Sequence, residues 1–232
     1  MTSEVQAAAA APQASTAPQP TIIPRSLFAF SIFYGGMVCI AGVLGSKQVA
    51  LGPLAVEAGI FPFLLLVSLA SVVAELHGRP TADRLVRFGF VPLVTAILLT
   101  WLVIQLPTDE GMYEPAKQAF PIVLGQSWRL MAAGILAYGV SQTLNVLIFS
   151  RLKSGMGRWV AARGAIAGVL SQIVDTLIFI TVAFYRVRPI ANLIAGQMLA
   201  KVVLSIVLVP LVIKALIALG HWLDGRPAKL SS

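Results

Sequence analysis

Asp175 is the residue whose place in the sequence most clearly indicates chemistry, because it is an acid inside a long apolar stretch. It lies sixteen residues beyond the start of the run 159–185, about 24 Å along a helix at ~1.5 Å per residue. An ionised side chain at that depth of a bilayer is costly and is commonly functional. Gln172, Thr176 and Phe179 share its face of the helix. This group predicts a ligand site, and the simpler alternative is that Asp175 only bonds to a neighbouring helix.

Lys201 is the second ionisable residue inside an apolar run. It lies within 190–219, with Gln197 one helical turn before it and Ser205 one turn after it. A lysine near a helix end can extend its ammonium to the membrane interface, but a long piece of helix precedes this one. Two roles stay open for it, a pairing with Asp175 or a direct contact with the substrate.

Four further residues complete the candidate site, and each also has an ordinary structural explanation. Glu75 ends the second apolar run, where an ion pair with Arg79 explains it equally well. Gln142 and Asn145 can line a cavity or bond one helix to another. Arg163 lies near a helix start, where reaching the interface is cheap. The candidate substrate-binding residues are Asp175, Gln172, Lys201, Asn145, Gln142, Glu75, Phe179 and Arg163.

The sequence carries no arrangement of residues that an enzyme or a metal site needs. The single cysteine, Cys39, lies in an apolar segment, and His77 and His221 lie far apart. There is no Asp/Asp or Ser/His pair at workable spacing, no HExxH motif and no P-loop for ATP. We therefore expect a protein that is not an enzyme, with no catalytic residue, no metal and no cofactor.

The composition predicts a membrane protein. Hydrophobic residues make up 58% of the 232, charged residues only 11%, and the mean hydropathy is +0.88. A soluble domain carries ~25% charged residues, so this chain has too little charge to cover a surface in water. Lys and Arg outnumber the acids by 17 to 9, but most of them lie in short gaps between apolar runs. That placement argues against a nucleic-acid partner and for the lipid bilayer.

Six stretches are long and apolar enough to cross a bilayer as helices, which takes ~20 residues each. They lie near residues 27–46, 58–77, 86–106, 128–150, 159–185 and 190–219. Pro210 is expected to kink the sixth helix or to mark its end. The predicted architecture is an all-α integral membrane protein, a bundle of six transmembrane helices at 25–223, with a disordered tail at 1–24 and a short C-terminal tail at 224–232.

The positive charges predict the orientation in the membrane. With six spans, both termini share one side, and the cations expected there are Arg25, Arg79, Arg84, Arg87, Arg151, Lys153, Arg158, Arg226 and Lys229. The opposite side has Lys47, Lys117, Arg186 and Arg188. Because the side richer in Lys and Arg is the cytoplasmic one, both termini are expected in the cytoplasm.

An internal repeat links the fourth and fifth predicted helices. Residues 141–149 read SQTLNVLIF and residues 171–179 read SQIVDTLIF, identical at five of nine positions, with Asn145 aligned to Asp175. The two helices run in opposite directions, so the pattern predicts an inverted repeat of the kind that builds a central site in transporters. Chance similarity between apolar helices is the alternative.

A GxxxG motif, Gly164 to Gly168, also lies on the fifth predicted helix. Such a motif permits close helix packing. It can serve the fold itself, or it can form the contact of a homodimer.

Together these residues resemble the queuosine precursor transporter family, formerly grouped as vitamin uptake transporters. The run SQIVDTLIFITVAFY at 171–185 resembles the family's most specific segment. The segment FPFLLLVSLASVVAELHGRPTADRLV at 61–86 and KVVLSIVLVP at 201–210 are similar to two others. The resemblance covers roughly residues 27–219. The family usually has an acidic residue at the position of Ser71 and Asp at the position of Asn145.

The resemblance implies a transporter in a bacterial cytoplasmic (inner) membrane that imports 7-cyano- or 7-aminomethyl-7-deazaguanine for queuosine in tRNA. A carboxylate can accept both the N–H and the amino group on one edge of such a base, which suits Asp175. Gln172, Gln142 or Asn145 can then serve the carbonyl edge, and Phe179 can stack on the ring. Two alternatives remain open, a substrate-capturing subunit that needs separate ATPase partners and an intramembrane enzyme.

Overall fold

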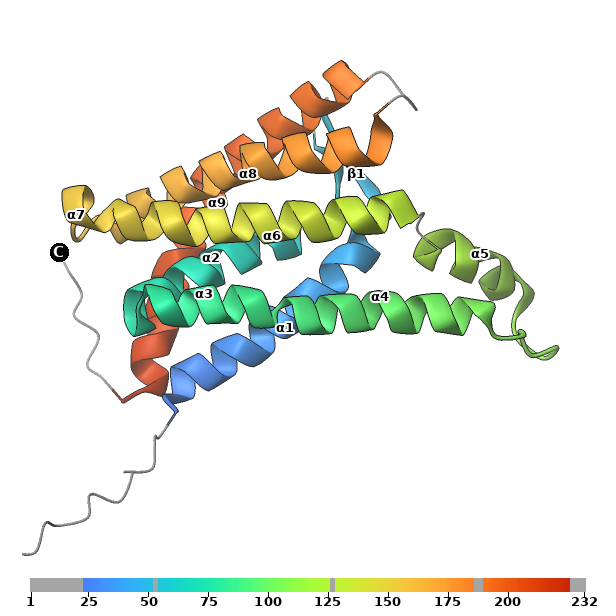
Figure 1. Ribbon diagram of the computed structural model, residues 1–232, viewed down its shortest axis with the longest axis horizontal. Coiled ribbons are helices and arrows are strands. Elements are labelled where there is room, and N and C mark those ends of the chain that lie inside the picture. Colours follow the sequence, from blue (N-terminus) through green and yellow to red (C-terminus); the bar gives the residue numbers. More distant parts are fainter. Residues whose placement is uncertain (1–22, 52–53, 126–127, 186–189, 226–232) are drawn as a thin grey trace, which may run out of the picture.

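The computed structural model describes residues 23–51, 54–125, 128–185 and 190–225, and these are almost entirely helical (Figure 1). The predicted tail at 1–24 and the predicted tail at 224–232 lie largely outside the described residues. In chain order the elements are α1 (Arg25–Gly45), β1 (Gln48–Leu51), β2 (Leu54–Glu57), α2 (Ile60–His77), α3 (Arg79–Phe88), α4 (Phe90–Gln105), α5 (Glu114–Leu124), α6 (Trp128–Arg151), α7 (Lys153–Met156), α8 (Val160–Phe184) and α9 (Ile190–Leu223).

The prediction of six transmembrane helices is confirmed. Among the described residues, six helical stretches are long and apolar enough to cross a membrane. They are Arg25–Gly45, Ile60–His77, Arg79–Gln105, Trp128–Met156, Val160–Phe184 and Ile194–Leu223. The third stretch joins α3 and α4, which follow one another almost in line (Figure 1). The chain is therefore a multi-pass membrane protein.

Two segments expected to be loops contain regular structure. The segment after the first span forms two antiparallel strands, β1 and β2, in which Gln48 pairs with Glu57 and Leu51 with Leu54. The Ala58 N–H donates a 2.8 Å hydrogen bond to the Lys47 carbonyl, which closes the base of the hairpin. The other segment forms α5, between the third and fourth spans. Both segments are too short to cross a bilayer, so the six-span count is unchanged.

Of the two outcomes expected for Pro210, a kink or the end of the sixth helix, the second is wrong. The helix α9 continues through Pro210 to Leu223. A proline removes one backbone N–H from the helix, and a transmembrane helix tolerates that loss because neighbouring groups satisfy the freed carbonyl.

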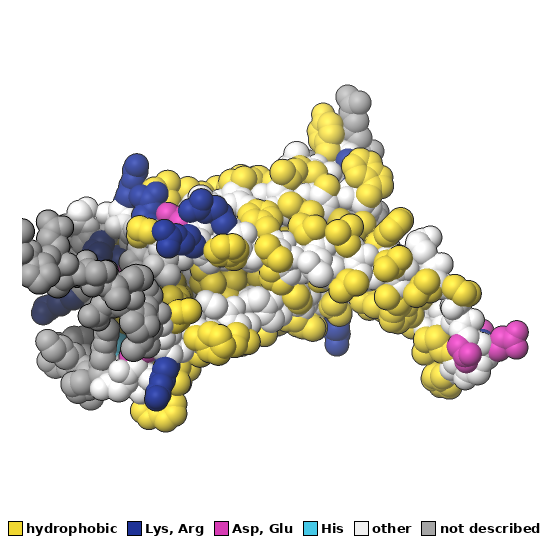
Figure 2. All heavy atoms as spheres, turned by 60° about the horizontal axis from the view of Figure 1, so that its bottom comes forward, with side chains coloured by type: hydrophobic (Ala, Val, Ile, Leu, Met, Phe, Trp, Pro, Cys, Tyr) yellow, Lys and Arg dark blue, Asp and Glu magenta, His cyan; other side chains and the backbone are white. Residues whose placement is uncertain are grey.

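The centre of the bundle is α2, which is the most buried of the six spans. Helix α8 packs against both α6 and α9. Helix α4 supplies part of the lipid-facing surface, because none of its residues is buried. Apolar side chains cover the middle of the molecule (Figure 2), as a surface in contact with hydrocarbon requires, since lipid tails offer no hydrogen-bond partners.

The GxxxG motif is used inside the chain. An added Cβ at Gly164 would lie 2.0 Å from Cδ1 of Ile213, and one at Gly168 would lie 3.6 Å from a methyl of Val209. Both contacts join α8 to α9, so the small residues allow these two helices to approach closely. The motif thus serves the fold.

Candidate substrate site

Asp175 and Lys201 form a buried ion pair between α8 and α9. Lys201 Nζ donates to Oδ2 of Asp175 at 2.9 Å, and Ser141 Oγ of α6 donates to Oδ1 at 3.2 Å. The two charged residues are only 4% and 9% exposed. Each carboxylate oxygen has two lone pairs, so the Asp175 carboxylate can still accept hydrogen bonds from a ligand. The sequence left the role of Lys201 open, and the structure shows the pairing.

The pair lines a cavity of about 390 Å³, a volume within the usual range for small-molecule sites. The wall is mainly apolar and comes from α1, α2, α4, α5 and α6, with charged residues on β2, α8 and α9. Gly45, Ser46 and Gly59 belong to the wall, so the cavity lies at the end of the bundle where the hairpin and α5 are found (Figure 1). A polar ligand can therefore meet a buried charge pair inside an apolar wall.

Three aromatic rings belong to the same cavity: Phe179 of α8, Phe63 of α2 and Tyr138 of α6. Lys201 Nζ lies 5.9 Å from the centre of the Phe63 ring, within the range of a cation–π interaction. Phe179 was predicted from its place one turn after Asp175. Phe63 was missed, because a phenylalanine in an apolar run carries no signal that separates it from a lipid-facing one.

Glu57 is a third charged residue of the cavity wall. The sequence analysis missed it, because it lies in a segment expected to be a loop between two spans. Burial raises the pKa of the Glu57 carboxyl, while the positive charge of Lys201 and the Gln197 side chain act in the opposite direction. The signal that could have found it is an acid at the edge of an apolar run.

Two buried amides lie deeper in the bundle than the cavity. Gln142 of α6 and Gln172 of α8 are completely buried, and none of their four side-chain polar atoms has a hydrogen-bond partner in the described part of the chain. A buried polar group without a partner costs ~1–3 kcal/mol. These two side chains do not line the cavity themselves.

Asn145 bonds helix to helix. Its amide nitrogen donates to the Val67 carbonyl at 3.1 Å and to Ser71 Oγ at 3.2 Å. Its Oδ1 atom has no partner among the described residues. The two positions at which this sequence departs from the resemblance noted above, Ser71 and Asn145, are therefore in direct contact.

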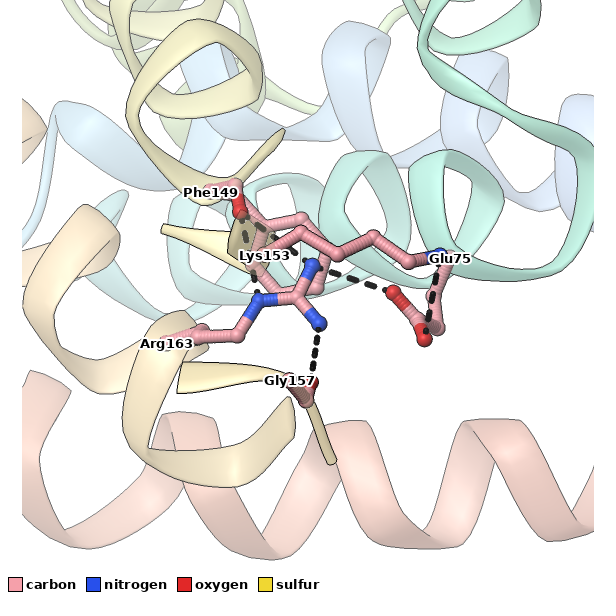
Figure 3. Close-up of polar contacts among 5 residues, drawn as sticks. All are labelled: Glu75, Phe149, Lys153, Gly157 and Arg163. Carbon is pink, nitrogen blue, oxygen red and sulfur yellow. Dashed lines mark hydrogen bonds and ion pairs between the residues drawn. The ribbon is translucent and has the colours of Figure 1, made fainter. Parts of the chain in front are cut away.

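Glu75 and Arg163 belong to a separate cluster at the far end of the bundle from the hairpin (Figure 3). Arg163 Nη2 lies 3.0 Å from Oε2 of Glu75 and 3.2 Å from the Phe149 carbonyl, and Nη1 donates to the Gly157 carbonyl at 3.0 Å. Lys153 Nζ lies 3.5 Å from the other Glu75 oxygen. The guanidinium also stacks over the Phe149 ring at 4.3 Å.

The contacts of this cluster exclude the simple structural explanations given above for Arg163 and Glu75. Arg163 does not reach a membrane interface, because its side chain is completely buried. Glu75 is not paired with Arg79, which instead pairs with Asp83 at 3.4 Å. The cluster ties α2, α6, α7 and α8 together.

The structure thus divides the eight predicted residues into three groups. Asp175, Lys201 and Phe179 line one cavity. Gln172, Gln142 and Asn145 are buried along the bundle between that cavity and the far end. Glu75 and Arg163 close the far end. Only the first group lies where a ligand in the cavity can touch it.

Comparison with known proteins gives consistent relatives. The chain is 24% identical over 165 residues to the Queuosine precursor transporter of Escherichia coli (strain K12), covering 70% of each chain. It is 27% identical over 167 residues to the Probable queuosine precursor transporter of Bacillus subtilis, covering 68% of this chain and 69% of that one. A relative of the same name in Haemophilus influenzae is 26% identical over 126 residues, half of its length. No solved structure matches the chain.

A family model supports the same relationship. The model described as Putative vitamin uptake transporter matches residues 57–215. That range begins at Glu57 in the hairpin and continues through the Asp175–Lys201 pair into the second half of α9. It covers more than half of the chain, and the chain accordingly belongs to the vitamin uptake transporter family.

Proposed function

We propose that this protein imports a queuosine precursor, a 7-deazaguanine base, and that the Asp175–Lys201 cavity is its binding site. The observation that carries the proposal is a buried carboxylate and ammonium 2.9 Å apart inside an otherwise mainly apolar cavity. A scaffold that only faces lipid has no use for such a pair. The names of the three relatives point to the substrate class.

The chemistry of a guanine-like base fits the groups in the cavity. Its N1–H and 2-amino group lie on one edge, and the Asp175 carboxylate can accept hydrogen bonds from both. Hydrogen bonds to a charged group are about twice as strong as neutral ones, which offsets part of the cost of removing water from a polar heterocycle. Phe63 and Phe179 offer faces on which the planar ring can stack.

A polar path is proposed to lead from the cavity to the other end of the bundle. Gln172 lies one turn before Asp175 on α8, and Gln142 occupies the matching position of the repeat on α6. Their unpaired amides can hydrogen-bond a base that leaves the cavity. Beyond them, the pairing of Arg163 with Glu75 blocks the end of the path. In this proposal the Arg163–Glu75 ion pair closes the path at that end.

We place both termini in the cytoplasm and the protein in the bacterial inner membrane. Lys and Arg side chains gather at one end of the molecule, whereas acids stand out at the opposite tip (Figure 2). The first end is the one where α7 lies, α1 begins and α9 ends (Figure 1). The positive-inside rule makes the first end cytoplasmic. The cavity then lies toward the outer side, where an imported substrate arrives. A homodimer stays open as a further proposal, although the GxxxG motif is used within the fold.

The test is the queuosine content of tRNA in a host that can neither make nor import the precursor. Cells that express this chain and are fed a 7-deazaguanine precursor should recover queuosine. Asp175→Asn keeps the size of the side chain but turns one acceptor oxygen into a donor that faces the N–H edge of the base. Losing that acceptor should cost ~1–3 kcal/mol, roughly a ten- to a hundredfold loss of affinity.

The matched control is Asp109→Asn, since Asp109 is exposed and lies outside the cavity. It should leave uptake unchanged. Both variants are compared at equal amounts of protein in the membrane. Normal uptake by Asp175→Asn would show that the carboxylate is not the recognition element.

A further inference from the structure

Glu57 is placed to touch the same ligand as Asp175 but from another element. It is the last residue of β2, and the hairpin packs against α9. Its carboxyl is part of the cavity wall together with Asp175 and Lys201. The groups that face it are Gln197 and Lys201 of α9 and Asp175 of α8. The cavity therefore holds two acids and one base among its described residues.

Lys201 interacts with both acids. Its ammonium is 2.9 Å from Asp175, and its charge is the largest influence that favours the ionised form of Glu57. Asp175 already has a full cationic partner and a hydroxyl donor. The ion pair of Lys201 is with Asp175, and its charge acts on Glu57 at longer range, so an ionised Glu57 carboxylate can also pair with a cationic ligand group.

The order of polar groups around a 7-deazaguanine matches these three side chains. The 2-amino group and N1–H are donors, the 6-carbonyl follows as an acceptor, and the substituent on carbon 7 comes next on the same side as the carbonyl. With Asp175 on the two donors, Lys201 can donate to the carbonyl. The carbon-7 substituent then lies on the Lys201 side of the base, and Glu57 is the other acid of that cavity wall.

We infer that Glu57 contacts the substituent on carbon 7 and makes the site selective for the 7-aminomethyl base over the 7-cyano base. The aminomethyl group is an ammonium at neutral pH and donates a charge-assisted hydrogen bond to a carboxylate. The nitrile ends in an acceptor nitrogen, which an ionised carboxylate repels. The inference rests on the proposed function, because it assumes that a deazaguanine occupies the cavity.

The experiment compares uptake of the two bases by the full-length protein and by Glu57→Gln in the same host. Glu57→Gln keeps the shape of the side chain and removes its charge. It should lower uptake of the aminomethyl base by about tenfold and leave uptake of the cyano base equal or higher. The matched control is Glu114→Gln, because Glu114 is 68% exposed, pairs with Lys117 and does not line the cavity.

The results separate this inference from the proposed function. If the unaltered protein carries neither base, the proposed function fails. If it carries both and Glu57→Gln changes both equally or neither, only the selectivity of Glu57 is overturned. The protein level in the membrane is measured for each variant, and uptake of the cyano base is the internal control for folding.

The pH dependence of the unaltered protein is a second measurement that needs no variant. Burial raises the pKa of Glu57, so the carboxyl is protonated at low pH and ionised at higher pH. The ratio of aminomethyl to cyano uptake should therefore rise with external pH as this carboxyl ionises, while an alkyl ammonium keeps its charge. A ratio that does not change with pH would overturn the inference.

Discussion

The ammonium of Lys201 and the carboxylate of Asp175 lie 2.9 Å apart on two different helices, and neither side chain is more than 11% exposed. Burying either charge alone is strongly unfavourable, whereas a pair with further hydrogen bonds offsets much of that cost. The two residues therefore depend on one another for the stability of the bundle, independently of what the cavity binds.

This dependence predicts the behaviour of single and double variants. Lys201→Met leaves the Asp175 carboxylate buried without a cation, and should destabilise the detergent-solubilised protein by ~3–5 kcal/mol. The double variant Asp175→Asn with Lys201→Met removes both charges and should recover most of that loss. Thermal unfolding followed by size-exclusion chromatography measures both. The double variant should still fail in uptake. A double variant as unstable as Lys201→Met would contradict the coupling.

Arg163 is predicted to stabilise the folded protein through its contacts with Glu75, Phe149 and Gly157. Arg163→Met removes its hydrogen bonds to Glu75, Phe149 and Gly157 and should cost ~3–5 kcal/mol, because Glu75 loses its closest cation. Arg163→Lys should rescue only part of this, since one ammonium cannot reproduce the fork of the guanidinium.

The control is Arg158→Gln, a nearby exposed arginine, which should change the unfolding temperature little. An Arg163→Lys variant as stable as the unaltered protein would mean that the charge alone matters, and that the contacts to the two backbone carbonyls contribute nothing.

Because α8 packs closely on α9, a side chain larger than that of glycine is predicted to destabilise the protein at position 164. The new Cβ of Gly164→Ala would meet Ile213 Cδ1 at 2.0 Å, so the Ile213 side chain must move, at a cost of ~1–3 kcal/mol. Adding Ile213→Ala should relieve the clash. Gly36→Ala is the control, because its Cβ would meet nothing within 4 Å. If Gly164→Ala and Gly36→Ala unfold at the same temperature, the packing argument is wrong.

The orientation is tested with reporters. Fusions at residue 25 and after Lys229 should both report a cytoplasmic location, because the cations gather at that end of the molecule and the positive-inside rule applies. Activity of an external reporter at either position would overturn the six-span orientation. The same result would also reverse the side on which the cavity is placed.

The span count and the two central charges could be predicted without a structure. Whether a stretch can cross a bilayer depends on its own length and polarity, and an ionisable residue in such a stretch is conspicuous wherever its partner lies. Asp175 and Lys201 were therefore identified correctly as a potential pair. Ser141, the first residue of the repeat on α6, was not predicted as a site residue, although it bonds to Asp175.

What only the tertiary structure decided is which polar residues meet. These helices are apolar around most of their circumference, so periodicity does not show which face turns inward. Rotation and depth of each helix are set by packing against its neighbours. That packing buries Arg163 against Phe149 and Glu75, and joins Asn145 to Ser71.

Glu57 is the clearest case of a residue that local sequence could not assign. In the sequence it is one acid in a short segment between two spans, like those that face water. In the structure a hairpin turns that segment back against α9, and the carboxyl faces Lys201 and Asp175 in the cavity. The sequence by itself determined six spans and two buried charges, because these are properties of single segments. The third charge of the site was decided by the tertiary structure, because it depends on how a short hairpin packs against helices distant in the chain.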